Sequence, residues 1–107
     1  MTERTEKISQ MIRKLSAEFL GRENNKTSLI TVTSSDTSPD LKKATIFITV
    51  LPESREATAL DFAKRKRAEL RDYLKKNMQI KTIPFIDIQI DRGEKNRQKI
   101  DELLREK

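Results

Sequence analysis

The sequence predicts an α+β fold in the order helix, strand, strand, two helices, strand, helix, within one domain that spans residues 1–107. Two segments, Lys43–Leu51 and Pro84–Asp91, alternate apolar and polar residues as strands do. Other segments place apolar residues at the three- and four-residue spacing of helices. With 107 residues, of which 35% are hydrophobic, the chain has material for one modest core.

The first element is predicted as a helix over Glu6–Leu20. Thr5 is the expected cap and Gly21 the expected end, since a threonine oxygen can accept from the first turn and glycine often follows the last. One face of this helix is apolar. It carries Ile8, Met11, Ile12, Leu15 and Phe19.

Two strands are expected next. Ser28–Ser35 places Ile30 and Val32 on one face, and the segment Asp36–Asp40 has the composition of a turn. Lys43–Leu51 alternates more cleanly, so it is the strongest strand prediction in the chain. One of its faces is expected to carry Ala44, Ile46, Ile48 and Val50, and the other Thr45, Phe47, Thr49 and Leu51.

A long helical stretch is expected from Ser54, as its cap, to about Asn77. Wound as one straight helix, it would place Arg67 in the middle of the apolar stripe. Either Arg67 extends out along its own stem, or the segment breaks near Arg65–Ala68 into two helices. The break is the favoured interpretation. The apolar stripe consists of Leu60, Ala63, Leu70, Leu74 and Met78.

The last strand is expected over Pro84–Asp91, with Ile86, Ile88 and Ile90 on one face. A terminal helix is expected over residues 92–107, because Ile100, Leu103 and Leu104 recur at helical spacing. This helix is expected to pack loosely.

The net charge of +6 lies entirely in the segment Phe62–Lys81, which has eight basic and two acidic residues, whereas both flanks are neutral. Such a cluster favours binding of RNA by contact with phosphates, against the alternatives of a solvated helix face or a membrane surface. Tyr73 and Phe62 are its only aromatic residues, which limits stacking on bases. The predicted RNA-binding residues are Lys64, Arg65, Lys66, Arg67, Arg71, Lys75, Lys76 and Lys81.

The composition argues against an enzyme and against a cofactor. Histidine and cysteine are absent, which removes the commonest general base, thiol nucleophile and zinc ligands, and the two glycines exclude a Walker loop. A magnesium site built from Asp87 with Asp91, or from Asp36 with Asp40, is a weaker alternative to polar strand faces and turns. With no secretion signal or apolar run of roughly 18 residues, the expected location is the cytoplasm.

Two blocks of sequence resemble the bacterial ribosome-binding factor A family, which are KH-like assembly factors of the small ribosomal subunit. The first block is Ser38-Pro-Asp-Leu-Lys-Lys-Ala44 with the strand that follows it. The second is similar to the family in the order and spacing of its helix, basic lead-in and final strand. It comprises Leu70, Arg71, Leu74, Met78, Ile80, Lys81, Pro84, Ile86, Ile88 and Asp91.

The resemblance implies a KH-like fold of type II topology, α-β-β-α-α-β plus a C-terminal helix, with a mixed three-stranded sheet and helices packed on one side. It implies binding to free or immature small ribosomal subunits through rRNA and a role in rRNA maturation. A monomer is expected. Alternatives are a generic KH-like binder of RNA or DNA and a carboxylate-metal ribonuclease.

Two glycine features separate this chain from related folds. With only Gly21 and Gly93, it has no GXXG loop of the kind with which ordinary KH domains clamp nucleic acid. The family usually has Ala-x-Gly between the two middle helices, where this chain has Lys66-Arg67-Ala68. Since alanine is the strongest helix former, the sequence does not force a bend at this position by glycine. Because the GXXG loop is missing, contact with RNA is expected from side chains.

Overall fold

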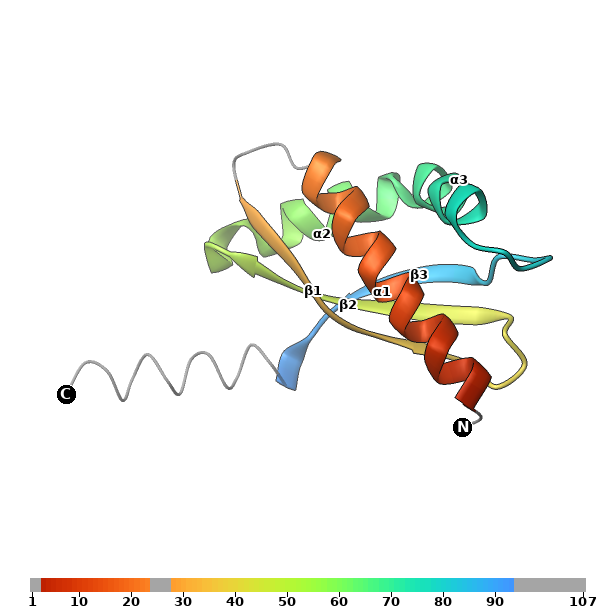
Figure 1. The fold of residues 1–107 in the computed structure, drawn as a ribbon. Coiled ribbons are helices and arrows are strands. Elements are labelled where there is room, and N and C mark those ends of the chain that lie inside the picture. Colours follow the sequence, from red (N-terminus) through yellow and green to blue (C-terminus); the bar gives the residue numbers. More distant parts are fainter. Residues whose placement is uncertain (1–2, 24–27, 94–107) are drawn as a thin grey trace.

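The computed structural model describes residues 3–23 and 28–93 (Figure 1). The helix predicted for residues 92–107 lies almost wholly outside them. The observed elements are α1 Glu3–Glu23, β1 Leu29–Thr37, β2 Lys43–Leu51, the short 3₁₀ helix η1 Glu53–Arg55, α2 Glu56–Arg65, α3 Arg67–Asn77 and β3 Phe85–Ile90.

The three strands form one mixed sheet, as predicted, and their order in the sheet is β1-β2-β3. β1 runs antiparallel to β2, while β3 runs parallel to β2 and places Ala44 opposite Ile86. Parallel strands need a crossover, which η1, α2 and α3 supply. The helices pack on one face of the sheet, with α1 against β1 and α2 against β3 (Figure 1).

The core lies between this face and the helices. The four residues predicted to share one face of β2, Ala44, Ile46, Ile48 and Val50, are all buried, and Ile86 and Ile88 of β3 are buried beside them. From α1, the predicted apolar residues are buried except Met11, which is 47% exposed. The buried apolar residues of α1 are Ile8, Ile12, Leu15, Phe19 and Leu20.

A β-bulge at Thr33 changes which residues of β1 face the core. Val32 pairs with Ile48 but Ser34 pairs with Phe47, so Thr33 is an extra residue in the ladder. Before the bulge Val32 is buried, and after it Thr37 is. The Ser9 hydroxyl donates to Thr37 Oγ1 at 2.6 Å, which satisfies a polar group inside the core.

The predicted ends of the first helix were wrong. α1 begins at Glu3, so Thr5 lies inside its first turn and is buried. Gly21 lies inside the last turn of α1, which ends at Glu23. Its φ is not positive, and a Cβ at this position would meet no atom within 4 Å. Nothing in this backbone therefore requires a glycine or ends the helix at that residue.

The turn after β1 starts later than predicted, because Asp36 and Thr37 still pair with β2. The turn is built by the backbone N–H of Leu41, which donates to the Ser38 carbonyl at 2.9 Å, with Leu41 at φ 61°. Asp40 Oδ1 accepts from the Ser38 hydroxyl at 2.6 Å and from the backbone N–H of Lys42 at 3.1 Å. These hydrogen bonds lower the pKa of Asp40.

The start of the long helical stretch also differs from the prediction. Ser54 makes no capping hydrogen bond, since it lies within the single turn of η1, where the N–H of Arg55 donates to the Pro52 carbonyl at 2.9 Å. α2 continues from this turn at Glu56. The predicted end at Asn77 is confirmed.

Candidate nucleic-acid interface

The basic segment folds as two helices, so the predicted break near Arg65–Ala68 is confirmed. α2 ends at Arg65 and α3 begins at Arg67, with Lys66 between them at φ −91° and ψ 5°. Lys66 has a negative φ, and Ala68, which stands at the position of the family glycine, lies inside α3, so neither position requires a glycine. The N–H of Lys66 donates to the carbonyls of Phe62 and Ala63 at 3.2 and 3.1 Å.

Arg67 lies outside the apolar stripe because the bend turns it away from the core. Its Nε donates to the Lys64 carbonyl at 3.2 Å, and its guanidinium carbon lies 5.6 Å from the centre of the Phe85 ring. One side chain therefore connects the end of α2, the start of α3 and the start of β3. The buried stripe is then completed by Ala63 before the bend and by Leu70 after it.

Three of the predicted cations converge on one hollow of about 230 Å³ between α3 and the segment before β3. Arg71 and Lys75 are one helical turn apart on α3, and Lys81 comes from the following loop. Asp72 is the acidic residue in the same lining. Arg71 also donates from a terminal nitrogen to the Ile83 carbonyl at 3.1 Å, which holds the loop against the helix.

Lys64 lies apart from this group, beside β3. It lines a second hollow, of about 350 Å³, together with Asp87, Gln89 and Arg92. The Gln89 side chain donates to Asp87 at 3.0 Å, and this bond is the main reason why the pKa of Asp87 is lowered, with smaller contributions from Lys43 and Lys64. Asp87 is therefore a carboxylate at neutral pH, with two lysines nearby.

The remaining predicted cations differ in how far they are engaged. Arg65 pairs with Asp61 at 3.5 Å, and Lys66 pairs with Glu69 at 3.4 Å. Lys75, Lys76 and Lys81 are exposed, with no hydrogen bond or ion pair to any described residue. These three lysines can exchange solvent for phosphate without breaking an internal contact.

Tyr73, the aromatic residue deepest in the basic segment, is used to fasten α3 to α1. Its ring packs against Phe19, with centroids 5.7 Å apart, and its hydroxyl donates to Glu18 at 3.1 Å. Arg22 lies over the same ring at 4.8 Å and donates to its hydroxyl. Tyr73 is thus occupied within the fold, and its ring is not presented to a ligand.

A further aromatic residue, Phe85, is not among the predicted site residues. It is 56% exposed at the start of β3, on the face opposite the buried Ile86. The alternation of β3 contains this signal, since inward Ile86 and Ile88 direct Phe85 outward. Its proximity to Arg67 and Lys43 had no sequence signal, because it depends on the bend and on the parallel pairing with β2.

Three of the four carboxylates considered as magnesium ligands, Asp40, Asp87 and Asp91, accept hydrogen bonds from other groups of the fold. Asp87 accepts from Gln89, and Asp91 accepts from the Thr33 hydroxyl at 2.5 Å. Asp36 lies in the β1–β2 ladder and Asp40 in the turn beyond it. Within residues 3–23 and 28–93, no group of three or more acidic side chains is placed to hold a metal ion.

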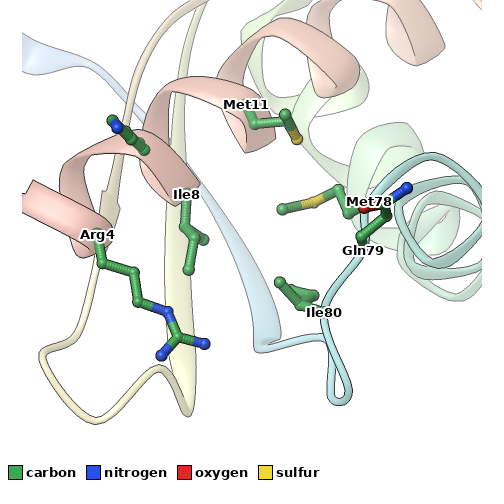
Figure 2. A pocket seen from close by; sticks show the side chains of 7 residues that line it. Arg4, Ile8, Met11, Met78, Gln79 and Ile80 are labelled. Carbon is green, nitrogen blue, oxygen red and sulfur yellow. The ribbon is translucent and has the colours of Figure 1, made fainter.

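A further hollow, of about 490 Å³, is largely apolar and contains none of the predicted cations. Figure 2 shows Ile8 and Met11 of α1 facing Met78 and Ile80 across it. Arg4 lines the end of this hollow (Figure 2). The basic hollow at Arg71, Lys75 and Lys81 shares no lining residue with it, but a larger hollow of about 750 Å³ borders both, since Ile8 and Lys81 both line it.

Comparison with known proteins shows the family of this chain. A family model for ribosome-binding factor A matches residues 4–104. The chain belongs to the ribosome-binding factor A family. A ribosome-binding factor A of Magnetococcus marinus is 32% identical over 108 residues, which cover 97% of this chain and 88% of the relative. The resemblance inferred from sequence is thus confirmed.

Solved structures of ribosome-binding factor A share the fold. A crystal structure of the Thermus thermophilus protein matches with a TM-score of 0.75 at 18% identity, over 82% of this chain and 96% of that one. A homology model of a Thermus thermophilus ribosome-binding factor A, fitted into a cryo-electron microscopy map of a 30S complex, matches with a TM-score of 0.68 at 18% identity. It covers 78% of this chain and 91% of that one. The predicted KH-like fold is confirmed.

The helices of the described part were also compared with what a membrane span requires. None of the helices within residues 3–23 and 28–93 combines the length and the apolar character needed to cross a membrane.

Proposed function

We propose that this chain binds free or immature small ribosomal subunits through their rRNA and assists rRNA maturation, as a monomer in the cytoplasm. Membership of the ribosome-binding factor A family supports the partner, as does a related protein fitted as part of a 30S complex. The observation that carries the proposal is the convergence of Arg71, Lys75 and Lys81 on one hollow.

The charge distribution supports contact with phosphate. The whole net charge of +6 comes from the segment that contains α3 and the bend, and its exposed lysines Lys75, Lys76 and Lys81 have no partner among the described residues. Each lysine that neutralises a phosphate releases a counterion, so binding gains entropy and becomes sensitive to salt. The eight cations of the sequence prediction remain the proposed contacts, with these three lysines as the freest.

The proposed mode of action is binding without catalysis. A factor that binds one conformation of the subunit better than another shifts the population toward it, which requires no reacting group. Incubating the protein with small-subunit rRNA and magnesium tests this point. Cleavage that is lost in Asp87→Asn or Asp91→Asn would instead favour the carboxylate-metal ribonuclease.

The binding proposal is tested by co-sedimentation of the protein with purified small subunits and with whole ribosomes. The variant is Lys75→Gln/Lys81→Gln, because neither side chain makes a hydrogen bond or ion pair with another residue of the described ranges. Arg13→Gln/Lys14→Gln is the matched control, since it removes two exposed charges from α1. We expect the first variant to bind small subunits more weakly than the control and the wild type.

Two results would contradict the proposal. Equal binding of both variants would remove the basic hollow as the contact. Equal affinity of the wild type for small subunits, whole ribosomes and short RNA or DNA would favour a generic KH-like binder.

A further inference from the structure

We propose that Phe85, backed by Arg67, is a stacking platform for one unpaired base of the bound RNA. This inference rests on the proposed function and adds to it the recognition of a single-stranded nucleotide. It concerns a residue outside the basic segment and a type of contact that charge alone does not supply.

The exposed ring of Phe85 lies beside the guanidinium of Arg67. Phe85 is 56% exposed, an unusual state for a large apolar ring, and the Arg67 guanidinium carbon lies 5.6 Å from the ring centre. Arg67 is itself fixed by its hydrogen bond to the Lys64 carbonyl. The ring is therefore held on one side and open on another, which is the arrangement that a stacked base requires.

Basic residues lie near Phe85 on the neighbouring strand and on the helices. Phe85 pairs with Lys43 across the parallel ladder, and its N–H donates to the Lys42 carbonyl at 2.9 Å. Lys43 and Arg67 thus bring two cations to Phe85, and Lys64 adds a third beside Asp87, two residues further along β3. Phosphates on either side of a stacked nucleotide would meet positive charge.

The neighbouring residues on the outer face of β3 are polar. Asp87 and Gln89 share the outer face with Phe85 and line the adjoining hollow. A carboxylate repels phosphate but accepts from the amino group of a base, and a glutamine amide both donates and accepts. The face therefore favours a base over a phosphate beside the ring.

The two aromatic rings of the basic segment, Tyr73 and Phe62, already contact other residues of the fold. Tyr73 is bound by Phe19, Glu18 and Arg22, and Phe62 is half-buried, with the Lys66 ammonium 5.9 Å from its ring centre. Among these rings, Phe85 is the one most open to a ligand. An exposed aromatic side chain next to cations is the combination used by proteins that bind single strands.

The test uses the full chain in which Phe85 is replaced by tryptophan. The natural sequence has no tryptophan, so Phe85→Trp introduces one indole fluorophore at the proposed platform. Leu29→Trp is the matched control, because Leu29 is also 56% exposed but lies at the far end of the sheet, opposite Leu51. Each variant is titrated with purified small subunits and with their isolated rRNA.

We expect strong quenching of the indole fluorescence in Phe85→Trp and little change in Leu29→Trp, since stacking on a base quenches indole. We also expect Phe85→Leu to bind small subunits about tenfold more weakly, the scale of one base stacked on an aromatic side chain. Phe85→Tyr keeps the ring and is expected to restore the affinity.

Four outcomes would overturn the inference. Quenching that is equal at both tryptophans excludes a specific platform, and a shift of emission to shorter wavelength without quenching indicates contact with a protein instead of a base. Wild-type affinity in Phe85→Leu likewise excludes it, while leaving the binding proposal intact. If the wild-type protein fails to bind small subunits, the proposed function fails first, and the platform with it.

Discussion

The Arg67 side chain donates a hydrogen bond from Nε to the carbonyl oxygen of Lys64, at 3.2 Å, across the bend between α2 and α3. The last carbonyl groups of a helix have no partner within the helix, so this bond satisfies one of them. It also fixes the guanidinium beside Phe85. A residue selected as a phosphate contact from its charge is thus also a structural element of the bend.

Replacing Arg67 by alanine should lower the free energy of unfolding by about 0.5–1 kcal/mol, because a carbonyl loses its partner at a largely exposed site. Urea denaturation measures this loss. Lys75→Ala is the control, since Lys75 lies on the same helix without such a contact, and its effect should stay within about 0.5 kcal/mol. Equal losses in the two variants would mean that the hydrogen bond contributes nothing to stability.

Ala68→Gly, which restores the family's glycine, should destabilise this chain by up to about 1 kcal/mol. Lys66 at the bend has a negative φ, and Ala68 lies within α3, so a glycine at residue 68 relieves no strain. It only increases the conformational freedom of the unfolded chain. Ala57→Gly is a close control, because both alanines are second in their helices and neither is buried. A smaller loss at Ala68 than at Ala57, by thermal or urea unfolding, would reveal strain at the bend.

Much of the fold was predictable where one period continued without interruption. The bounds of Lys43–Leu51 agree with the structure to the residue, since nine alternating positions leave one register. The bend was predictable because Arg67 conflicted with the apolar stripe. The bulge at Thr33 was not, since one inserted residue leaves no mark in a polar strand, and the burial of Thr37 depends on the distant Ser9.

The candidate site was predictable as a list of charges but not as a surface. Charge counting selected eight cations, yet it gave no means to see that Arg71 is partly engaged by the Ile83 carbonyl. That contact depends on how the loop before β3 returns to α3. Phe85 was accessible in principle, since its outward parity follows from Ile86 and Ile88, but its role depends on Arg67 lying beside it.

Two serines of α1 should respond in opposite ways to alanine. Ser16 Oγ is buried with no hydrogen-bond partner in the described structure, so Ser16→Ala should raise the free energy of unfolding by about 1 kcal/mol. Ser9→Ala should lower it by a similar amount, since it removes the donor to Thr37 Oγ1. Urea unfolding of the two variants side by side checks the sign. A loss in Ser16→Ala would point to a polar partner for Ser16.

Asp40 should contribute a pH-dependent stability to the turn before β2. Its pKa is lowered from 3.8, first by the Ser38 hydroxyl and then by the N–H of Lys42, so the folded state favours the carboxylate. This contribution is present above 3.8 and is lost as the pH falls through the lowered folded-state pKa. Asp40→Asn should therefore be less stable than the wild type at neutral pH, with the difference shrinking in acid. A difference that is constant across this range would exclude the linkage.

The last prediction concerns the salt dependence of binding to small subunits. If Lys75 and Lys81 each neutralise one phosphate, Lys75→Gln/Lys81→Gln should flatten the plot of log affinity against log salt by about 1.4–1.8 in slope. Co-sedimentation across a series of monovalent salt concentrations, at constant magnesium, measures that slope. Arg13→Gln/Lys14→Gln should leave it unchanged, because those residues lie on α1, outside the basic hollow. Weaker binding by the first variant with an unchanged slope would show that the two lysines act through the shape of the loop, since only lost phosphate contacts reduce the number of counterions released.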